Sequence, residues 1–240
     1  MKYSVIINLS QETVEQLNKQ NYTLCCFLAS KSENTSLFTP LCWSTTKGFL
    51  QSVLIQWEDS LCAYLSTSAI IENKVIYIPQ PVAAGLEPAS RQTIAGSNYK
   101  IALKERMLIE NDGKVSIDTD NEFNNVLIQN NSPTPYSTGL CVYNTNDDLY
   151  YGNCVFNTNG KQNIKVSPVA KTFLMFTSKN IENNTVIFNA ENQGMLIDLT
   201  SSKDNSRTVS YDINTGWSSN KQVWGKEYLA GTDLKTLLNF

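Results

Sequence analysis

The chain has 240 residues, a formal net charge of −3, a sequence isoelectric point near 5.1 and no histidine. Without histidine, the sequence excludes Ser-His-Asp and Cys-His nucleophiles, imidazole general bases and imidazole metal ligands. The acidic balance, with no dense cluster of Lys and Arg, argues against nucleic acid as a partner, because phosphate binding needs concentrated positive charge. With 41% hydrophobic residues the chain can bury its own core, so we expect a single domain over residues 1–240.

The two ends of the chain each predict a short helix. Residues 3–9 carry an apolar side chain at every second position, which is the period of a strand. Ser10 is a suitable cap for a peripheral helix over residues 11–19, and the apolar run at residues 22–29 predicts a buried strand. The last segment has apolar residues at helical spacing. A terminal helix should therefore dock on the body through three leucines, Leu234, Leu237 and Leu238.

Between these ends, nearly every segment predicts a short strand followed by a turn rich in Asn, Asp and Gly. The predicted strands cover residues 41–45, 53–57, 61–66, 75–78, 99–109, 114–117, 125–129, 140–144, 163–166, 172–177, 185–188, 195–199 and 207–212. Many short strands at such spacings are typical of a sandwich or barrel. We therefore expect a mainly β fold, an antiparallel β-sandwich with one short helix near each terminus. Prolines near residues 79–98 predict a crossover between sheets, or a hinge that divides the domain.

The cysteines and the N-terminus bear on the cellular compartment. The cysteines show no C-x-x-C pair and no disulfide-dense spacing, and most follow a leucine in an apolar run. We expect free thiols in the core rather than a cysteine-only zinc site, and we predict no metal and no cofactor. The first residues are too polar for a signal-peptide core, and no run approaches the roughly 18 apolar residues of a membrane-spanning helix. We therefore expect a protein that is cytoplasmic as synthesised, with any release following a non-classical route.

One acidic run resembles the first residues of a calcium-binding loop. Residues 118–122 alternate carboxylates as such a loop does. The pattern then fails, because Phe123 stands at the sixth position in place of glycine and Gln129 at the twelfth in place of a bidentate Glu. We interpret this run as a solvated turn.

Two segments, residues 144–153 and 211–217, place aromatic rings beside Asp, Asn and Gly, and Trp224 follows closely. Such rings stack on the apolar face of a sugar while carboxylates and amides bind its hydroxyls. They also suit a lipid headgroup, where a choline lies over the rings, and they are common packing residues in strands. From loops at the end of a sandwich we predict a ligand-binding cluster of eight residues: Asp148, Tyr150, Tyr151, Tyr211, Asp212, Asn214, Trp217 and Trp224.

The same segments carry a resemblance to a known family. Residues 148–153 (DLYYGN) and 211–218 (YDINTGWS) resemble parts of the headgroup-binding region of actinoporin-type cytolysins, where the two parts occur in the opposite order and closer together. The N-terminal strand, helix and Leu-Cys strand, followed by Trp43 and Trp57, are loosely similar to uncharacterised β-rich proteins of fungi and bacteria. Both resemblances imply an all-β binding or cytolytic module, and neither implies a catalytic residue.

These observations predict a non-enzymatic recognition module that binds a cell-surface glycan or a membrane lipid headgroup, as a pore-forming cytolytic toxin or a subunit of one. The alternative is a structural protein that forms homo-oligomers by pairing exposed strands, which an Asn/Ser/Thr-rich surface of low charge permits. An enzyme would have to use Asp, Glu, Tyr, Lys or Cys alone, and no pairing of these residues in the sequence indicates a catalytic site.

Overall fold

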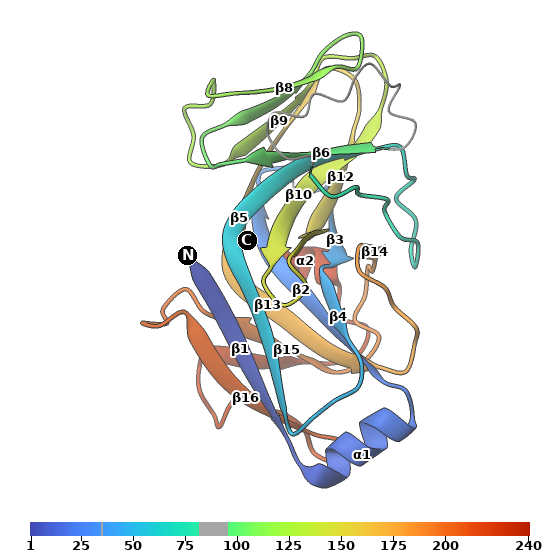
Figure 1. The fold of residues 1–240 in the computed structure, drawn as a ribbon, viewed down its shortest axis with the longest axis vertical. Helices are drawn as coiled ribbons and strands as arrows, with labels where there is room; N and C mark the ends of the chain where they lie inside the picture. The colour runs from blue at the N-terminus through green and yellow to red at the C-terminus, as the bar shows by residue number, and fades with distance from the viewer. Residues whose placement is uncertain (35, 82–95) are drawn as a thin grey trace.

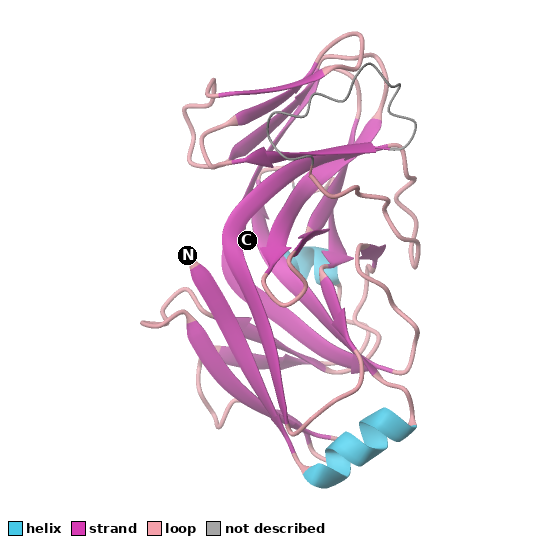
Figure 2. Cartoon of the chain, in the orientation of Figure 1, coloured by secondary structure: helices cyan, strands magenta, loops and turns pink. Residues whose placement is uncertain are grey.

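The computed structural model describes residues 1–34, 36–81 and 96–240, which form two curled β-sheets that pack together, with a short helix near each terminus (Figures 1 and 2). The prediction of a mainly β, sandwich-like fold is confirmed. The predicted division near residues 79–98 falls mostly outside the described residues. The elements are β1 (Lys2–Leu9), α1 (Gln11–Lys19), β2 (Thr23–Ser32), β3 (Phe38–Cys42), β4 (Ser44–Thr46), β5 (Ser52–Ser66), β6 (Gly96–Ile101), β7 (Arg106–Ile109), β8 (Val115–Asp118), β9 (Val126–Asn130), β10 (Tyr136–Asn144), β11 (Leu149–Gly152), β12 (Cys154–Thr158), β13 (Gln162–Thr177), β14 (Thr185–Val186), β15 (Gly194–Asp198), β16 (Ser206–Asp212), β17 (Gly216–Ser218), β18 (Gly225–Tyr228) and α2 (Leu234–Leu238).

The strand order places β5 and β13 in the interior of the two sheets. The first sheet runs β14-β3-β12-β10-β5-β1-β16-β17, with β11 joined to β10 and β6 joined to β5. The second runs β18-β15-β13-β9-β7-β8, with β2 paired to β13 and β4 paired to β2. Among the strands described, β1 with β16 and β7 with β9 are parallel, and the other pairs are antiparallel. Each parallel pair joins strands that are not consecutive in the chain, because a tight hairpin produces only an antiparallel pair.

The strands β5 and β13 are 15 and 16 residues long and run through most of the length of the molecule in Figure 1. The prediction of two separate strands in each of them, at 53–57 and 61–66 and at 163–166 and 172–177, is wrong. The intervening residues form β-bulges, where the ladder shifts register and the strand continues. A bulge bends a strand without ending it.

Three other predicted strands also differ from the structure. Residues 41–45 divide between β3 and β4 at Trp43. Residues 99–109 divide into β6 and β7 because the chain turns at Lys104, whose φ is 71°. The Glu105 carboxylate closes this turn by accepting a hydrogen bond from the Ala102 amide at 2.7 Å. Residues 75–78 form no strand, and Val75 makes an isolated bridge to Thr185 of β14 in the first sheet.

Both predicted helices are confirmed. The hydroxyl of Ser10 caps α1 by accepting a hydrogen bond from the Thr13 amide at 3.2 Å. Asp233 caps α2 in the same way through the Lys235 amide at 2.9 Å. The helices bury their apolar sides against the sheets through Val14, Leu17, Leu234 and Leu238.

The core contains a close backbone approach that requires a glycine. A Cβ atom at Gly139 in β10 would lie 2.1 Å from the carbonyl oxygen of Cys154 in the neighbouring strand β12. Glycine in a strand interior often marks such an approach. Gly139 therefore allows β10 and β12 to lie side by side without displacing the backbone.

All six cysteines are buried and free. Burial raises the pKa of the Cys26 and Cys62 thiols to about 12 each, so these groups are almost entirely protonated at pH 8. We expect a thiol reagent at pH 8 to leave the native protein almost unlabelled within minutes and to titrate six thiols after unfolding without a reductant. Fast labelling of the native protein, or recovery of fewer thiols after unfolding, would contradict this placement of the cysteines.

Candidate functional site

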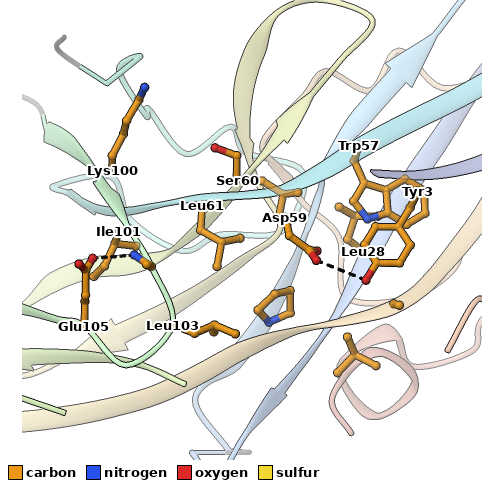
Figure 3. A pocket seen from close by; sticks show the side chains of 15 residues that line it. Tyr3, Leu28, Trp57, Asp59, Ser60, Leu61, Lys100, Ile101, Leu103 and Glu105 are labelled. Carbon is orange, nitrogen blue, oxygen red and sulfur yellow. Dashed lines mark hydrogen bonds between the residues drawn. The ribbon is translucent and has the colours of Figure 1, made fainter. Parts of the chain in front are cut away.

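A pocket of about 790 Å³ opens at the waist of the molecule, where both β5 and β13 bulge (Figure 3). We call it the waist pocket, and its walls include Tyr3, Trp57, Asp59, Glu105 and Ala170. Bulges are frequent beside functional sites because the extra residues re-aim side chains out of the regular alternation. A concave, mostly apolar site with a few convergent polar groups is the usual form of a ligand pocket.

The bulge in β5 presents a carboxylate to the waist pocket. Val142 of β10 pairs with Leu61, but the next residue of β10 pairs with Glu58, so Asp59 and Ser60 have no partner residue in β10. The Asp59 amide donates instead to the Met1 carbonyl at 2.9 Å. In Figure 3 the Asp59 side chain extends toward Tyr3 and the Ser60 side chain points away. The Ser60 hydroxyl instead lies 2.7 Å from the Tyr150 hydroxyl.

The bulge in β13 forms the opposite wall. Pro168 pairs with Ser30, and the next pair along the ladder joins Thr172 to Leu28. Three residues of β13 therefore lie opposite a single residue of β2, which accommodates a proline that cannot donate to the ladder. Two of these three residues line the waist pocket, Val169 and Ala170.

The floor of the waist pocket is apolar and carries an aromatic stack. Its buried side chains are Leu28, Trp57, Leu61, Ile101 and Val142. The half-buried ring of Tyr3 lies against Trp57 with ring centroids 5.4 Å apart and planes inclined by 22°. One face of the Tyr3 ring is thus covered by Trp57, and the ring forms part of the pocket wall.

Two carboxylates line the same waist pocket, Asp59 from β5 and Glu105 from the turn after β6. The Tyr3 hydroxyl donates to Oδ2 of Asp59 at 3.4 Å. Burial raises the pKa of Asp59, while burial and the nearby Asp59 charge raise the pKa of Tyr3. Tyr3 therefore remains a phenol at neutral pH and can both stack and hydrogen-bond.

In the structure, the eight residues of the predicted ligand-binding cluster lie in different parts of the fold. Tyr150 is 8% exposed and joins a buried cluster, while the half-buried Tyr151 donates from its hydroxyl to Asp147 at 2.9 Å. Asp148 is exposed and accepts a hydrogen bond from the Tyr143 hydroxyl. These contacts tie the β10–β11 hairpin together, and Ser60 links it to the bulge of β5.

The second aromatic segment packs in the core beside α1. Trp217 is 2% exposed and stacks on Phe176 with centroids 5.4 Å apart, and Tyr211 lies 4.4 Å from the same ring. Asp212 accepts hydrogen bonds from Ser10, the cap of α1, and from Thr13 in its first turn. The remaining two predicted residues are Asn214, exposed in a turn, and Trp224, half-buried under Arg207.

These groups do not meet in one cluster. Through the ladders of the first sheet, Tyr150 aligns with Lys2 of β1 and Tyr211 aligns with Leu9. At about 3.3 Å per residue, the two alignments are more than about 20 Å apart along β1. A ligand-binding role for any one group stays a prediction, but a single cluster of all eight residues does not form.

The residues that the sequence did not indicate are Tyr3, Trp57 and Asp59. Tyr3 and Trp57 lie in separate predicted strands, and their contact depends on the register of β1 against β5. Asp59 stood in a polar interruption that was interpreted as a turn. The available signal was the length of that interruption, because three residues between two apolar runs also fit a bulge within one strand.

Carboxylates with lowered pKa predict how stability depends on pH. Hydrogen bonds from Arg106 lower the pKa of Asp118, and the Asn214 amide lowers that of Asp212. Such groups stabilise the fold above the unfolded-state pKa of about 4, and the contribution is lost as pH falls through the folded-state pKa. We expect stability in urea to be nearly constant from pH 5 to 8 and to decrease below about pH 4. Asp118→Asn should reduce the loss of stability below about pH 4. A sharp change in stability near pH 6 would contradict this explanation.

Comparisons of the chain with protein-family models, with curated proteins and with solved structures give no match. Within residues 1–34, 36–81 and 96–240, no helix is long and apolar enough to cross a membrane. The described part of the chain also contains no group of three or more His, Cys, Asp or Glu side chains that could hold a metal ion.

Proposed function

We propose that the protein is a non-catalytic recognition module that binds a carbohydrate in the waist pocket. The observation that carries the proposal is the stack of Tyr3 on Trp57 beside the bulged Asp59. An aromatic ring offers a flat surface to the apolar face of a sugar, and a carboxylate accepts hydrogen bonds from its hydroxyls. The pocket is also large enough for a sugar, since ligand sites commonly measure about 300–1,000 Å³.

A lipid headgroup has less support from the same pocket. A phosphate group would approach two carboxylates, Asp59 and Glu105, and like charges repel. Strand-mediated assembly also has less support, because the strands at the two ends of each sheet are short. In the first sheet β14 and β17 have two and three residues, and in the second β18 and β8 have four each. Short edges are one way in which proteins prevent pairing between chains.

The proposal predicts that removing the Tyr3 ring weakens sugar binding. A screen against a panel of immobilised glycans should first identify a ligand, and titration calorimetry should then give its affinity. We expect Tyr3→Ala to weaken binding by about 1–3 kcal/mol, because stacked aromatic side chains are frequent hot spots. Asp59→Asn should also weaken binding, since the amide replaces one acceptor oxygen by a donor.

The matched control is Tyr77→Ala, which removes an exposed tyrosine that does not line the waist pocket. This variant should bind like the unmodified protein, and the glycan should be recovered chemically unchanged after incubation. Unfolding in urea should accompany each titration, because Tyr3 also packs against Trp57. Equal affinity for the Tyr3→Ala and Tyr77→Ala variants, both folded, would refute binding in this pocket.

A further inference from the structure

We propose that the sugar recognised in the waist pocket carries free amino groups, as glucosamine units do, and that Asp59 and Glu105, which lie on separate parts of the pocket wall, each bind an ammonium. This inference rests on the proposed function, because it names the class of sugar that the same pocket takes.

Three charged residues are among those that line the waist pocket: Asp59, Glu105 and Lys100. The strand register shows that the Lys100 side chain points away from the pocket. On the β5–β6 ladder, Ile101 lies opposite Leu61, and both belong to the pocket floor. Lys100 lies opposite Cys62, and neighbouring residues of a strand point to opposite faces of the sheet. In Figure 3 the Lys100 ammonium accordingly extends away from the pocket. The charged groups directed to the pocket are therefore the two carboxylates.

Each carboxylate keeps one oxygen available to a ligand. Asp59 receives the Tyr3 hydroxyl on Oδ2, and Glu105 receives the Ala102 amide on Oε2. No described residue donates a hydrogen bond to Oδ1 of Asp59 or to Oε1 of Glu105. A carboxylate oxygen only accepts, so the ligand has to supply donors, and an ammonium supplies three together with the opposite charge.

One competing cation lies near Asp59. The amino group of Met1 is 3.8 Å from Oδ2, the oxygen that Tyr3 also contacts. The side chains of this pair are 59% and 42% exposed, and exposed ion pairs contribute little stability. A ligand ammonium at Oδ1 therefore does not have to displace a strong ion pair.

The same geometry disfavours other charged ligands. A sulfated or carboxylated sugar would bring an anion into a pocket lined by two carboxylates, and like charges repel. A choline group is bound best when several ring faces surround it, whereas the two rings that line the waist pocket, Tyr3 and Trp57, are stacked on each other. An N-acetyl group removes the charge that the acids would bind.

Three oligosaccharides with the same linkage test the inference: tetramers of β1,4-linked glucosamine, N-acetylglucosamine and glucose. Titration calorimetry of the full chain with each, at one pH and at low salt, compares them directly. We expect the glucosamine tetramer to bind at least about tenfold more tightly than the other two, with an affinity that falls as salt is added. Asp59→Asn and Glu105→Gln should each remove most of this preference, whereas Asp112→Asn, which changes an exposed acid outside the pocket, should preserve it.

The outcomes separate the inference from the proposed function. Similar affinity for all three tetramers, lost on Tyr3→Ala, would overturn the amino-sugar inference and support carbohydrate binding. Tightest binding of the N-acetylglucosamine tetramer would overturn the inference in the same way. Binding of phosphatidylcholine vesicles with no binding of any oligosaccharide would overturn both.

Discussion

Replacing Trp43 by alanine is expected to lower the free energy of unfolding by about 3–5 kcal/mol, the usual cost of truncating a fully buried aromatic side chain. Trp43 is completely buried, and its ring packs edge-on against Trp57 with centroids 6.1 Å apart. Its indole N–H donates to the Val142 carbonyl at 3.0 Å. The substitution leaves a cavity behind the floor of the waist pocket, and urea unfolding followed by circular dichroism measures the cost.

A pair of phenylalanine variants separates the hydrogen bond of Trp43 from its packing. Trp217 is also buried, but its indole N–H has no hydrogen-bond partner among the described residues. Both Trp43→Phe and Trp217→Phe keep an aromatic ring, and only the first removes a hydrogen bond. We expect Trp43→Phe to cost about 1 kcal/mol more than Trp217→Phe. Equal costs would contradict the role of the bond to Val142.

Filling the waist pocket is expected to abolish ligand binding. Ala170 lies in the bulge of β13 and lines the pocket, so Ala170→Trp places a large side chain where the sugar would stack. We expect the affinity for the glycan found by screening to fall by about two orders of magnitude or more, because a steric clash cannot be relieved in a packed wall. Titration calorimetry with the folded variant measures this loss.

Two further variants keep this test decisive. Ala102→Trp introduces the same side chain from the exposed turn after β6, where it strains the fold less, and it should also block the waist pocket. Ala230→Trp makes the same change at an exposed position outside the pocket and should leave binding unchanged. Undiminished binding by a folded Ala170→Trp and a folded Ala102→Trp would place the ligand elsewhere.

The local elements could be predicted because their determinants are local. The alternation in residues 3–9, the hydroxyl cap at Ser10 and the leucine spacing near the C-terminus each involve neighbours within one or two turns of chain. The repeated pattern of short apolar segments and turn residues was enough to predict a mainly β fold. The short strands β11, β12, β17 and β18 were not predicted, because their few residues show no clear alternation.

The bulges and the pocket depend on partners far away in the sequence. Whether residues 58–60 form a turn or a bulge is decided by β10, which continues beside them, and the sequence of β5 does not contain that information. The same holds for Gly139, whose need for glycine comes from the Cys154 carbonyl in another strand. Long-range pairing also buried Trp217 against Phe176, although its neighbours Asn214 and Gly216 indicated an exposed turn.

The most direct test of carbohydrate binding in the waist pocket is a crystal structure of the protein with the glycan identified by screening. The account predicts one sugar ring stacked against Tyr3, with a hydroxyl or amino group within hydrogen-bond distance of Asp59. A sugar bound at Tyr151 and Asp148, at Trp224 or at any other surface, with the waist pocket empty, would contradict it.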